Sequence, residues 1–305
     1  MQENPNITKT HFGVYGIFKE DKKILLIKKA RGPYTGLYDL PGGSQEAGES
    51  FEETLKREFL EETGLTLKSF SYKEEKTIIF SDFTKESLKE GTLAHHGMFY
   101  DIKEAVWDIS SLGDGIDSLG AKWVDIDTLT TQNATPFVLM AIGREIIHVA
   151  DEQDNIISTH LRGTPLPENR YAMIAANILY NLKGEILLHK IAAHKEWGGA
   201  WTYSAAGHVD AGEGYQEAAK RELFEELQIK AVDFEEIATL EMFKNGKRRA
   251  FHHVYKVISD AIPVPDENEI SEVRWFKKEE LKALAVTNKE LFYPLLLQLI
   301  ESGKL

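Results

Sequence analysis

The sequence predicts two α/β domains, each a mixed sheet packed between helices in an α/β/α sandwich. The first observation is an internal repeat, because Gly43–Leu65 recurs as Gly207–Ile229 with the same spacing of glycine, glutamate and an Arg-Glu-apolar-x-Glu-Glu run. The second is that a hairpin pattern precedes each copy, and further strands and a helix follow it. A chain of 305 residues has room for two such domains.

Each half begins with two short strand patterns joined by a polar turn. These are Val14–Phe18 and Ile24–Lys28 in the first half, and Ile174–Tyr180 and Ile186–His189 in the second. Apolar and polar residues alternate here and β-branched residues are frequent, as is typical of strands. Residues 1–9 are polar, so we expect them to fray.

A glycine-rich loop leads from each hairpin into the repeated segment, which predicts a helix. The loops cover residues 32–43 and 198–207. Glycines at positions 42, 43 and 48 let the backbone approach a metal or phosphate closely. Gly64 fits a left-handed residue that closes the first helix.

Further strands and a closing helix follow each acidic helix. We expect strands through the similar segments His95–Tyr100 and His252–Tyr255, Trp-bearing strands at 122–126 and 273–276, and closing helices at 136–147 and 289–300.

We place the domain boundary near residue 146, which gives domains of residues 1–146 and 147–305. Ile156–Ser158 is then the first strand of the second domain, and Gly163–Asn169 is a connecting loop.

Charge and composition exclude several classes of function. The formal charge of −13 disfavours a polymeric nucleic-acid partner, whose phosphates need a basic surface. The absence of cysteine excludes disulfides, thiolate zinc sites and cysteine nucleophiles. No apolar run reaches the ~18 residues of a membrane span, and the N-terminus does not resemble a leader. We therefore expect a soluble, cytoplasmic protein without a membrane partner.

The first acidic helix places carboxylates beside its apolar stripe. At ~100° per residue, Phe51, Leu55 and Phe59 share one stripe, and Glu62 falls within ~20° of Leu55. Glu58 lies ~60° to one side of that azimuth, with Glu61 beyond it. A solvated acidic face would lie opposite the stripe, whereas unpaired carboxylates at its border are costly.

The second helix repeats this geometry around Tyr215, Ala219 and Leu223. Its border carboxylates are Glu222, Glu225 and Glu226. Metal coordination resolves the cost in both helices, because hard oxygen ligands suit Mg²⁺ or Mn²⁺. The alternative is a surface helix rich in Glu and Lys, as we expect for Lys277–Leu281, but two matches in equivalent places disfavour it.

An arginine on each helix can reach back to the preceding loop. Arg57 can pair with Glu49, and Arg221 with Glu213. We interpret these pairs as struts that fix the loop rather than as catalytic groups.

The repeated residues resemble the Nudix hydrolase signature, which is Gly, five residues, Glu, seven residues, then Arg-Glu-apolar-x-Glu-Glu-x-Gly-apolar. The first copy matches it fully, through Gly43, Glu49, Arg57, Glu58, Phe59, Glu61, Glu62, Gly64 and Leu65. The second copy matches except at the late glycine, where Gln228 stands; its matching residues are Gly207, Glu213, Arg221, Glu222, Leu223, Glu225, Glu226 and Ile229. Gln228 in a left-handed position costs ~1–2 kcal/mol but removes no ligand.

The resemblance implies metal-dependent hydrolysis of a nucleoside diphosphate derivative or a similar small diphosphate. By the family pattern, Mg²⁺ (or Mn²⁺) would bind Glu58, Glu61 and Glu62 in the first domain and Glu222, Glu225 and Glu226 in the second. Glu58, Glu61, Glu222 and Glu225 are the catalytic candidates among them. The remaining metal candidates are Gly42 and Ala206, next to the motif glycines, and Asp117 and Glu269, which each lie six residues before a Trp. An ordinary loop acid is an equally good interpretation of Asp117 and Glu269.

The second domain also resembles the family branch that includes isopentenyl diphosphate isomerase, through Trp201–Val209 and the upstream Arg162-Gly163. Isomerase chemistry in that branch needs a cysteine, which this chain lacks, so a hydrolase is the better interpretation. A nucleotide-sensing protein, in which one domain binds without turnover, is the alternative function. No proline follows Leu65 closely, which argues mildly against ADP-ribose as the first domain's substrate.

Weaker signals leave alternatives open. Adjacent histidines at 95–96 and 252–253 face opposite sides of a strand, so core or surface roles are favoured over one shared ion. Basic residues near the loops could contact phosphate or simply be solvated; these are Lys28, Lys29, Arg31, Lys190 and Lys195. Aromatic residues near the loops could stack on a base or pack in the core; these are Tyr34, Tyr38, Trp197 and Trp201.

Overall fold

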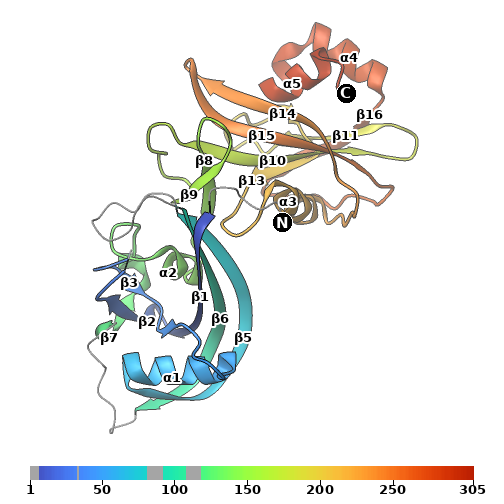
Figure 1. Cartoon of the computed structure of the whole chain (residues 1–305). Helices are drawn as coiled ribbons and strands as arrows, with labels where there is room; N and C mark the ends of the chain where they lie inside the picture. Colours follow the sequence, from blue (N-terminus) through green and yellow to red (C-terminus); the bar gives the residue numbers. More distant parts are fainter. Residues whose placement is uncertain (1–6, 33, 81–91, 108–117) are drawn as a thin grey trace. The chain divides into compact units, whose positions relative to one another are not determined.

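The structure is a computed structural model that describes residues 7–32, 34–80, 92–107 and 118–305. The chain divides into two compact units (Figure 1). The N-terminal unit comprises Gln2–His148 and Asn155–Pro165, and the C-terminal unit Val149–Asp154 and Leu166–Leu305. No helix among the described residues is long and apolar enough to cross a membrane.

The N-terminal unit is a mixed sheet with a helix on each face. Its path is β3-β2-β1-β6-β5, with β4 paired to β1 and β7 to β2; β1 and β6 run parallel and the other pairs are antiparallel. The elements are β1 (Ile7–Glu20), β2 (Lys23–Lys29), β3 (Tyr38–Asp39), β4 (Gly42–Gly43), α1 (Phe51–Thr63), β5 (Leu65–Phe80), β6 (Thr92–Trp107), β7 (Ser118–Asp125), the 3-10 turn η1 (Ile126–Thr128), α2 (Pro136–Ala141) and β9 (Ile156–Leu161). Strand β8 (Ile146–Ala150) begins in this unit, and its last two residues belong to the C-terminal unit.

The C-terminal unit has the same strand order. Its path is β12-β11-β10-β15-β14, with β13 and β8 paired to β10 and β16 to β11; β10 and β15 are the parallel pair. The elements are β10 (Tyr171–Tyr180), β11 (Ile186–Ile191), β12 (Trp201–Thr202), β13 (Ala205–His208), α3 (Tyr215–Leu227), β14 (Glu235–Lys244), β15 (Lys247–Ile258), β16 (Ile270–Phe276), α4 (Lys278–Thr287), the 3-10 turn η2 (Lys289–Leu291) and α5 (Pro294–Glu301). The predicted pair of α/β domains is therefore confirmed.

Apolar helix faces fix each acidic helix on its sheet. Leu55 and Phe59 of α1 are fully buried against Val14 and Met98. In the C-terminal unit, Leu223 of α3 packs with the other residues of a second buried cluster, Leu179, Leu187, Ala205, Leu227, Ile229, Val257 and Ile270. The opposite face of that sheet is covered by α5 through Leu295, Leu296 and Leu299. Burial of such side chains is the main force that holds a helix on a sheet.

Several predicted boundaries are wrong. The helix expected at 136–147 ends at Ala141, because Gly143 adopts a left-handed φ of 81° and the buried strand β8 begins soon after. The helix expected at 289–300 begins only at Pro294, because Phe292 and Tyr293 are extended and proline favours the first helical turn. Strand β1 begins at Ile7, inside the stretch expected to fray.

The segment after β8 also differs from expectation. Ile156–Ser158 is a strand as predicted, but Asn155–Pro165 groups with the N-terminal unit rather than opening the second domain. The domain boundary near residue 146 stays a prediction.

The two histidine pairs are not equivalent in position. Gly43 lies opposite Val14, which pairs with Met98, whereas Gly207 lies opposite Ala175, which pairs with His253. Met98 therefore corresponds to His253, and the two histidine pairs are offset along their strands. The segments His95–Tyr100 and His252–Tyr255 are similar in sequence, but the strand register does not align their histidines.

The two acidic helices end alike but with different residues. Gly64 closes α1 with φ 72°, and Gln228 closes α3 with φ 57°, so both predicted left-handed positions are confirmed. Glutamine has a Cβ that makes this conformation unfavourable, whereas glycine does not.

We expect Gln228→Gly to raise the free energy of unfolding of the C-terminal unit by roughly 1 kcal/mol, and Gly64→Gln to lower that of the N-terminal unit similarly. Urea unfolding combined with hydrogen exchange of each unit measures both changes. Asn288→Gly is the control, because Asn288 ends α4 with φ −139° and gains nothing from glycine. An equal gain in Gln228→Gly and Asn288→Gly would contradict this explanation.

Candidate functional site

The last motif glutamate of each helix is buried and turned toward the glycine-rich loop. Glu62 is only 3% exposed, and its Oε2 accepts the N–H of Gly42 at 2.9 Å. Glu226 is only 6% exposed and accepts the N–H of Ala206. Helical spacing predicted the burial, while the loop partner is visible only in the folded chain.

The buried carboxylates carry an electrostatic penalty. Burial raises the pKa of Glu62 to about 8, although the hydrogen bond of Gly42 and the charge of Lys29 oppose this change. Burial and the charges of Glu222 and Glu269 likewise raise the pKa of Glu226 well above its ordinary value. Both glutamates are therefore stabilised by any cation placed beside them.

Glu226 also has an unsatisfied atom. Its Oε2 is buried and has no hydrogen-bond partner within the described part of the chain, and the nearest basic atom, His189 Nδ1, lies 3.8 Å away. Hard oxygen donors at a buried, negatively charged position fit Mg²⁺ or Mn²⁺.

Each motif arginine holds more carboxylates than the sequence predicted. Arg57 Nε lies 2.7 Å from Glu49 Oε1, as expected, but Arg57 Nη1 also lies 2.8 Å from Glu58 and 3.2 Å from Glu61. Its Nη2 donates to the carbonyl of Ser44 in the loop at 3.0 Å. The i,i+4 spacing of Glu61 from Arg57 was a sequence signal for one of these contacts, whereas the i,i+1 spacing of Glu58 gave none.

Arg221 repeats the arrangement in the second helix. Its Nη2 lies 2.6 Å from Glu213 Oε1 and donates to the carbonyl of His208. Its Nη1 lies 2.7 Å from Glu222 Oε1 and 2.9 Å from Glu225 Oε2. The described residues contain no group of three or more His, Asp or Glu side chains gathered to hold a metal ion. Two glutamates of each trio instead pair with the motif arginine, and the buried third accepts a loop N–H.

The motif glycines make room for a carboxylate. A Cβ at Gly43 would stand 2.5 Å from Glu58 Oε1, and a Cβ at Gly207 would overlap Glu222 even more closely. Real Cβ atoms do not approach an oxygen so closely. Glycine at these positions is thus explained by the carboxylate packed against it.

Of the two further carboxylates predicted from the sequence, Glu269 lies near the buried glutamate of its unit. Glu269 forms an ion pair with Lys195, and the charges of both act on Glu226. Asp117 lies outside the described residues. Sequence reasoning missed Asp39, which is 1% exposed, accepts a hydrogen bond from Thr135 Oγ1 at 2.7 Å and raises the pKa of Glu62 by its charge.

The adjacent histidines and the aromatic residues near the loops have different environments. His95 is buried, and its Nε2 lies 2.7 Å from the hydroxyl of Tyr15, whereas Nδ1 of His96 lies 2.7 Å from Oγ1 of Thr77. The two neighbours therefore face opposite sides of the strand, as expected. Trp201 is buried and Trp197 is exposed.

The basic residues near the loops also differ in their surroundings. Lys190 forms an ion pair with Glu272, with 2.6 Å between Nζ and Oε2. The charge of Lys29 instead acts on Glu58 and Glu62, where it opposes part of the rise in pKa that burial causes.

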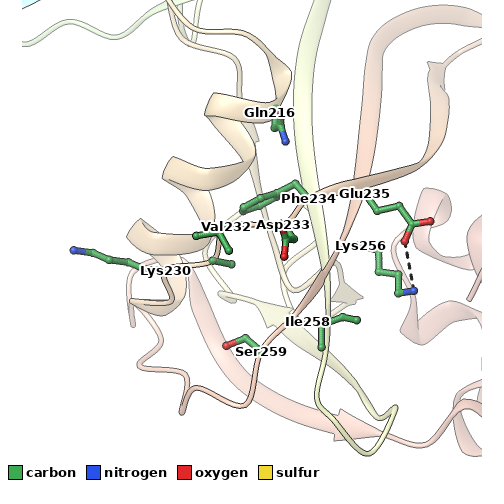
Figure 2. Close-up of a pocket in the computed structure, with 10 residues that line it drawn as sticks. Gln216, Lys230, Val232, Asp233, Phe234, Glu235, Lys256, Ile258 and Ser259 are labelled. Atoms are coloured by element: carbon green, nitrogen blue, oxygen red, sulfur yellow. Dashed lines mark ion pairs between the residues drawn. The ribbon is translucent and has the colours of Figure 1, made fainter.

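A shallow hollow of about 520 Å³ lies elsewhere on the C-terminal unit (Figure 2). It is lined by Gln216 at the start of α3, by residues of the segment between α3 and β14 such as Phe234, and by residues at the end of β15 such as Lys256. None of the metal candidates lines it. The site is therefore defined by the acidic helices and their loops rather than by this hollow.

Comparison with known proteins identifies both halves. The NUDIX domain matches residues 8–139 and 170–296. An uncharacterized Nudix hydrolase of Listeria monocytogenes is 32% identical over 146 residues, which is 46% of this chain and 84% of that protein. An isopentenyl-diphosphate Delta-isomerase of Photorhabdus laumondii is 30% identical over 146 residues and 81% of its length. An ADP-ribose pyrophosphatase of Methanocaldococcus jannaschii is 54% identical, but over 52 residues, 31% of its length.

Among solved structures, DR0079 of Deinococcus radiodurans has 28% sequence identity and a TM-score of 0.45, covering 52% of this chain and 98% of its own.

We expect Gly207→Ala to weaken metal binding in the C-terminal unit, because the added Cβ displaces the carboxylate of Glu222. The dissociation constant for Mn²⁺, followed by electron paramagnetic resonance, should rise by roughly tenfold or more, as for other changes that misplace a ligand. Gly246→Ala is the control for a general loss of stability, because its φ of 72° makes alanine strained there while its Cβ meets open space and displaces no carboxylate. Unchanged Mn²⁺ affinity in Gly207→Ala would contradict the argument.

Metal-free protein should lose stability as pH rises from 4.5 to about 8, because unfolded Glu62 releases its proton at the lower pH and folded Glu62 at the higher. Glu62→Gln abolishes this loss, so the variant matches the wild type below pH 4.5 and exceeds it above pH 8 by roughly a few kcal/mol.

Hydrogen exchange of β1 amides in the presence of a chelator measures the difference. Glu52→Gln, on the exposed side of the same helix, should keep the wild-type pH dependence. If Glu62→Gln keeps it too, another group causes the loss.

Proposed function

Since this chain belongs to the NUDIX domain family in both halves and is a Nudix-type diphosphohydrolase, we propose that divalent metal ions at both acidic helices support its activity. Its substrate is a nucleoside diphosphate derivative or a similar small diphosphate. The observation that carries this proposal is the pair of buried glutamates, Glu62 and Glu226, each bound to a loop N–H beside its motif glycine.

In the N-terminal unit, Glu58, Glu61 and Glu62 would hold the metal with the carbonyl of Gly42. A bound Mg²⁺ or Mn²⁺ supplies charge neutralisation at phosphate oxygens and polarisation of water. Burial raises the pKa of Glu58, so its carboxylate is a stronger base than that of an exposed glutamate.

In the C-terminal unit, Glu222, Glu225 and Glu226 would have the same roles with Ala206. Glu269 is a further ligand in this proposal, since its charge already acts on Glu226. Lys195, its ion-pair partner, is the candidate to bind a substrate phosphate, since its charge also acts on Glu226.

The hydrolytic reaction is favoured over isomerisation. One relative of the chain is an isopentenyl-diphosphate Delta-isomerase. Isomerase chemistry in that branch of the family needs a cysteine, and this chain has none in its 305 residues. The residue directly before the second motif glycine is Ala206, whose side chain has no reactive group. We therefore assign hydrolysis to both units, acting on small molecules in the cytoplasm.

Glu62→Gln and Glu226→Gln should each abolish the turnover of one unit. We expect the loss to exceed the roughly 10- to 100-fold effect typical of removing an outer partner of a metal ligand, because each change removes a ligand itself. Phosphate release is measured with Mg²⁺ on nucleoside triphosphates, nucleotide sugars, dinucleotides and prenyl diphosphates. A substrate lost in only one variant belongs to that unit.

Glu52→Gln and Glu217→Gln are the matched controls, since both residues are exposed in the first turn of the same helices. They should retain wild-type rates. Turnover that survives in the Glu62→Gln, Glu226→Gln double variant would refute the metal assignment. If Glu226→Gln alone changes no substrate, the C-terminal unit binds without turnover.

A further inference from the structure

The two acidic helices begin in different ways. Helix α1 starts with a capping box, in which the Ser50 side chain accepts the N–H of Glu53 and Glu53 accepts the N–H of Ser50. Helix α3 starts at Gly214, which offers no side-chain cap. The first N–H groups of a helix need partners, and such a cap fixes the helix start.

A side-chain network stands at the start of α3 instead. Tyr215, the first residue of the helix, donates its hydroxyl to Asp154 Oδ1 at 2.6 Å. Its ring stacks on His253 of β15, with centroids 3.7 Å apart and an interplanar angle of 15°. The second carboxylate oxygen of Asp154 lies 2.7 Å from His253 Nε2. One carboxylate thus joins a helix residue and a strand residue.

Asp154 comes from the segment Val149–Asp154, which belongs to the C-terminal unit although it precedes most of that unit in the sequence. Asp154 adopts φ 64°, a left-handed conformation that residues with a Cβ rarely adopt. Arg248 of β15 holds the same segment through the carbonyl of Glu152 at 3.1 Å. The segment is therefore held at its start by the pairing of Val149 and Ala150 with β10, and at its end by Arg248 and by the contacts of Asp154.

His253 meets a carboxylate at each ring nitrogen. Nε2 faces Asp154, and Nδ1 lies 3.1 Å from Glu236 Oε1. Both nitrogens can donate only in the imidazolium form. Burial lowers the pKa of His253, but the hydrogen bond and charge of Asp154 and the charge of Glu236 outweigh it, so the pKa stands above its ordinary 6.5.

The N-terminal unit shows that the fold does not require this network. The position of His253 is occupied there by Met98, which is buried in the apolar core. The position of Tyr215 is occupied by Phe51, which contacts Phe12. At these two positions the C-terminal unit has His253 and Tyr215, whereas the N-terminal unit has the uncharged residues Met98 and Phe51.

We propose that Asp154, Tyr215 and His253 form a pH-sensitive latch that ties the segment Val149–Asp154 to the start of α3 and thereby positions Glu222 and Glu226. Glu222 lies two helical turns after Tyr215, so a change at the helix start is transmitted along a rigid element. The three latch residues are positioning residues, since none lies among the metal candidates. The effect on metal binding rests on the proposed function, whereas the latch itself does not.

The latch weakens as pH rises. A histidine with a raised pKa contributes stability that is fully present below 6.5 and is lost as pH passes through the raised value. Other titratable groups lie near this cluster and set the background: Glu236 on β14, Glu217 on α3 and Tyr255 on β15, with His252 on the opposite face of the same strand. Burial is the main cause that lowers the pKa of His252 to about 3, with smaller effects of His208 and His253, so it stays neutral through this range.

The charge of His253 is tested by NMR titration of the full chain without metal, with the signal assigned by its loss in His253→Gln. We expect a pKa above 6.5 in the wild type and a fall in Asp154→Asn. Tyr215→Phe keeps the stacked ring and removes one hydrogen bond, so it should weaken the latch without endangering folding. Glu152→Gln is the matched control, because it removes an exposed charge from the same segment.

The positioning role is tested by hydrogen exchange in the first turn of α3 and by Mn²⁺ binding in a Glu62→Gln background, which isolates the C-terminal site. At pH 6.5, Asp154→Asn should speed exchange there and raise the dissociation constant for Mn²⁺ roughly fivefold, the lower range of coupling between separate sites. The difference from wild type should shrink as pH rises through the pKa of His253. Glu152→Gln should change neither quantity.

Different outcomes overturn different claims. A wild-type His253 that titrates at or below 6.5, or a titration unchanged by Asp154→Asn, refutes the latch. A latch that forms but leaves helix exchange and Mn²⁺ affinity unchanged refutes the positioning role. Absence of Mn²⁺ binding in otherwise wild-type protein refutes the proposed function, while titration and exchange still decide on the latch.

Discussion

The structure of each unit depends on one interaction, in which a glutamate at the end of the acidic helix is buried against the N–H of the glycine-rich loop. Glu62 binds Gly42 and Glu226 binds Ala206, so a helix and a sheet edge are joined by a carboxylate that water would otherwise solvate. The cost of burying this charge is offset only partly by the N–H. Other motif residues contact the same loop and helix. The arginine donates to a loop carbonyl and pairs with two further carboxylates, and the motif glycine leaves space for one of these carboxylates.

The two units use this junction with different supports. In the N-terminal unit, a capping box starts the helix and a glycine ends it, and apolar residues surround it. In the C-terminal unit, both local devices are missing, since Gly214 offers no cap and Gln228 replaces the closing glycine. A charged network around His253 stands at the helix start instead. Local sequence signals are thus replaced by long-range contacts, and the second helix becomes sensitive to groups outside its own segment.

Much of the fold could be predicted because its signals are local. Alternation in β1 and β10, the apolar stripe of Leu55 and Phe59, and the left-handed turns at Gly64 and Gln228 all follow from neighbouring residues. The predicted helix ends failed at Ile147 and at Lys289, where propensity favoured a longer helix than packing allows. Asp39 was missed because one carboxylate in a stretch expected to be a glycine-rich loop has no pattern, and it lies in strand β3 beside Thr135, far away in the sequence.

The sequence by itself determined the family, the repeated acidic helix and the set of carboxylates, because these depend on residue type and spacing along one helix. Only the tertiary structure decided how those carboxylates are held. It showed Arg57 and Arg221 drawing two glutamates of each trio together, placed Asp39 and Glu269 within electrostatic reach of the buried third, and brought Asp154 to His253. These relations depend on strand register and on chain segments that meet across the sheet. A single sequence carries no direct signal for them, since one residue of register reverses the face of every side chain.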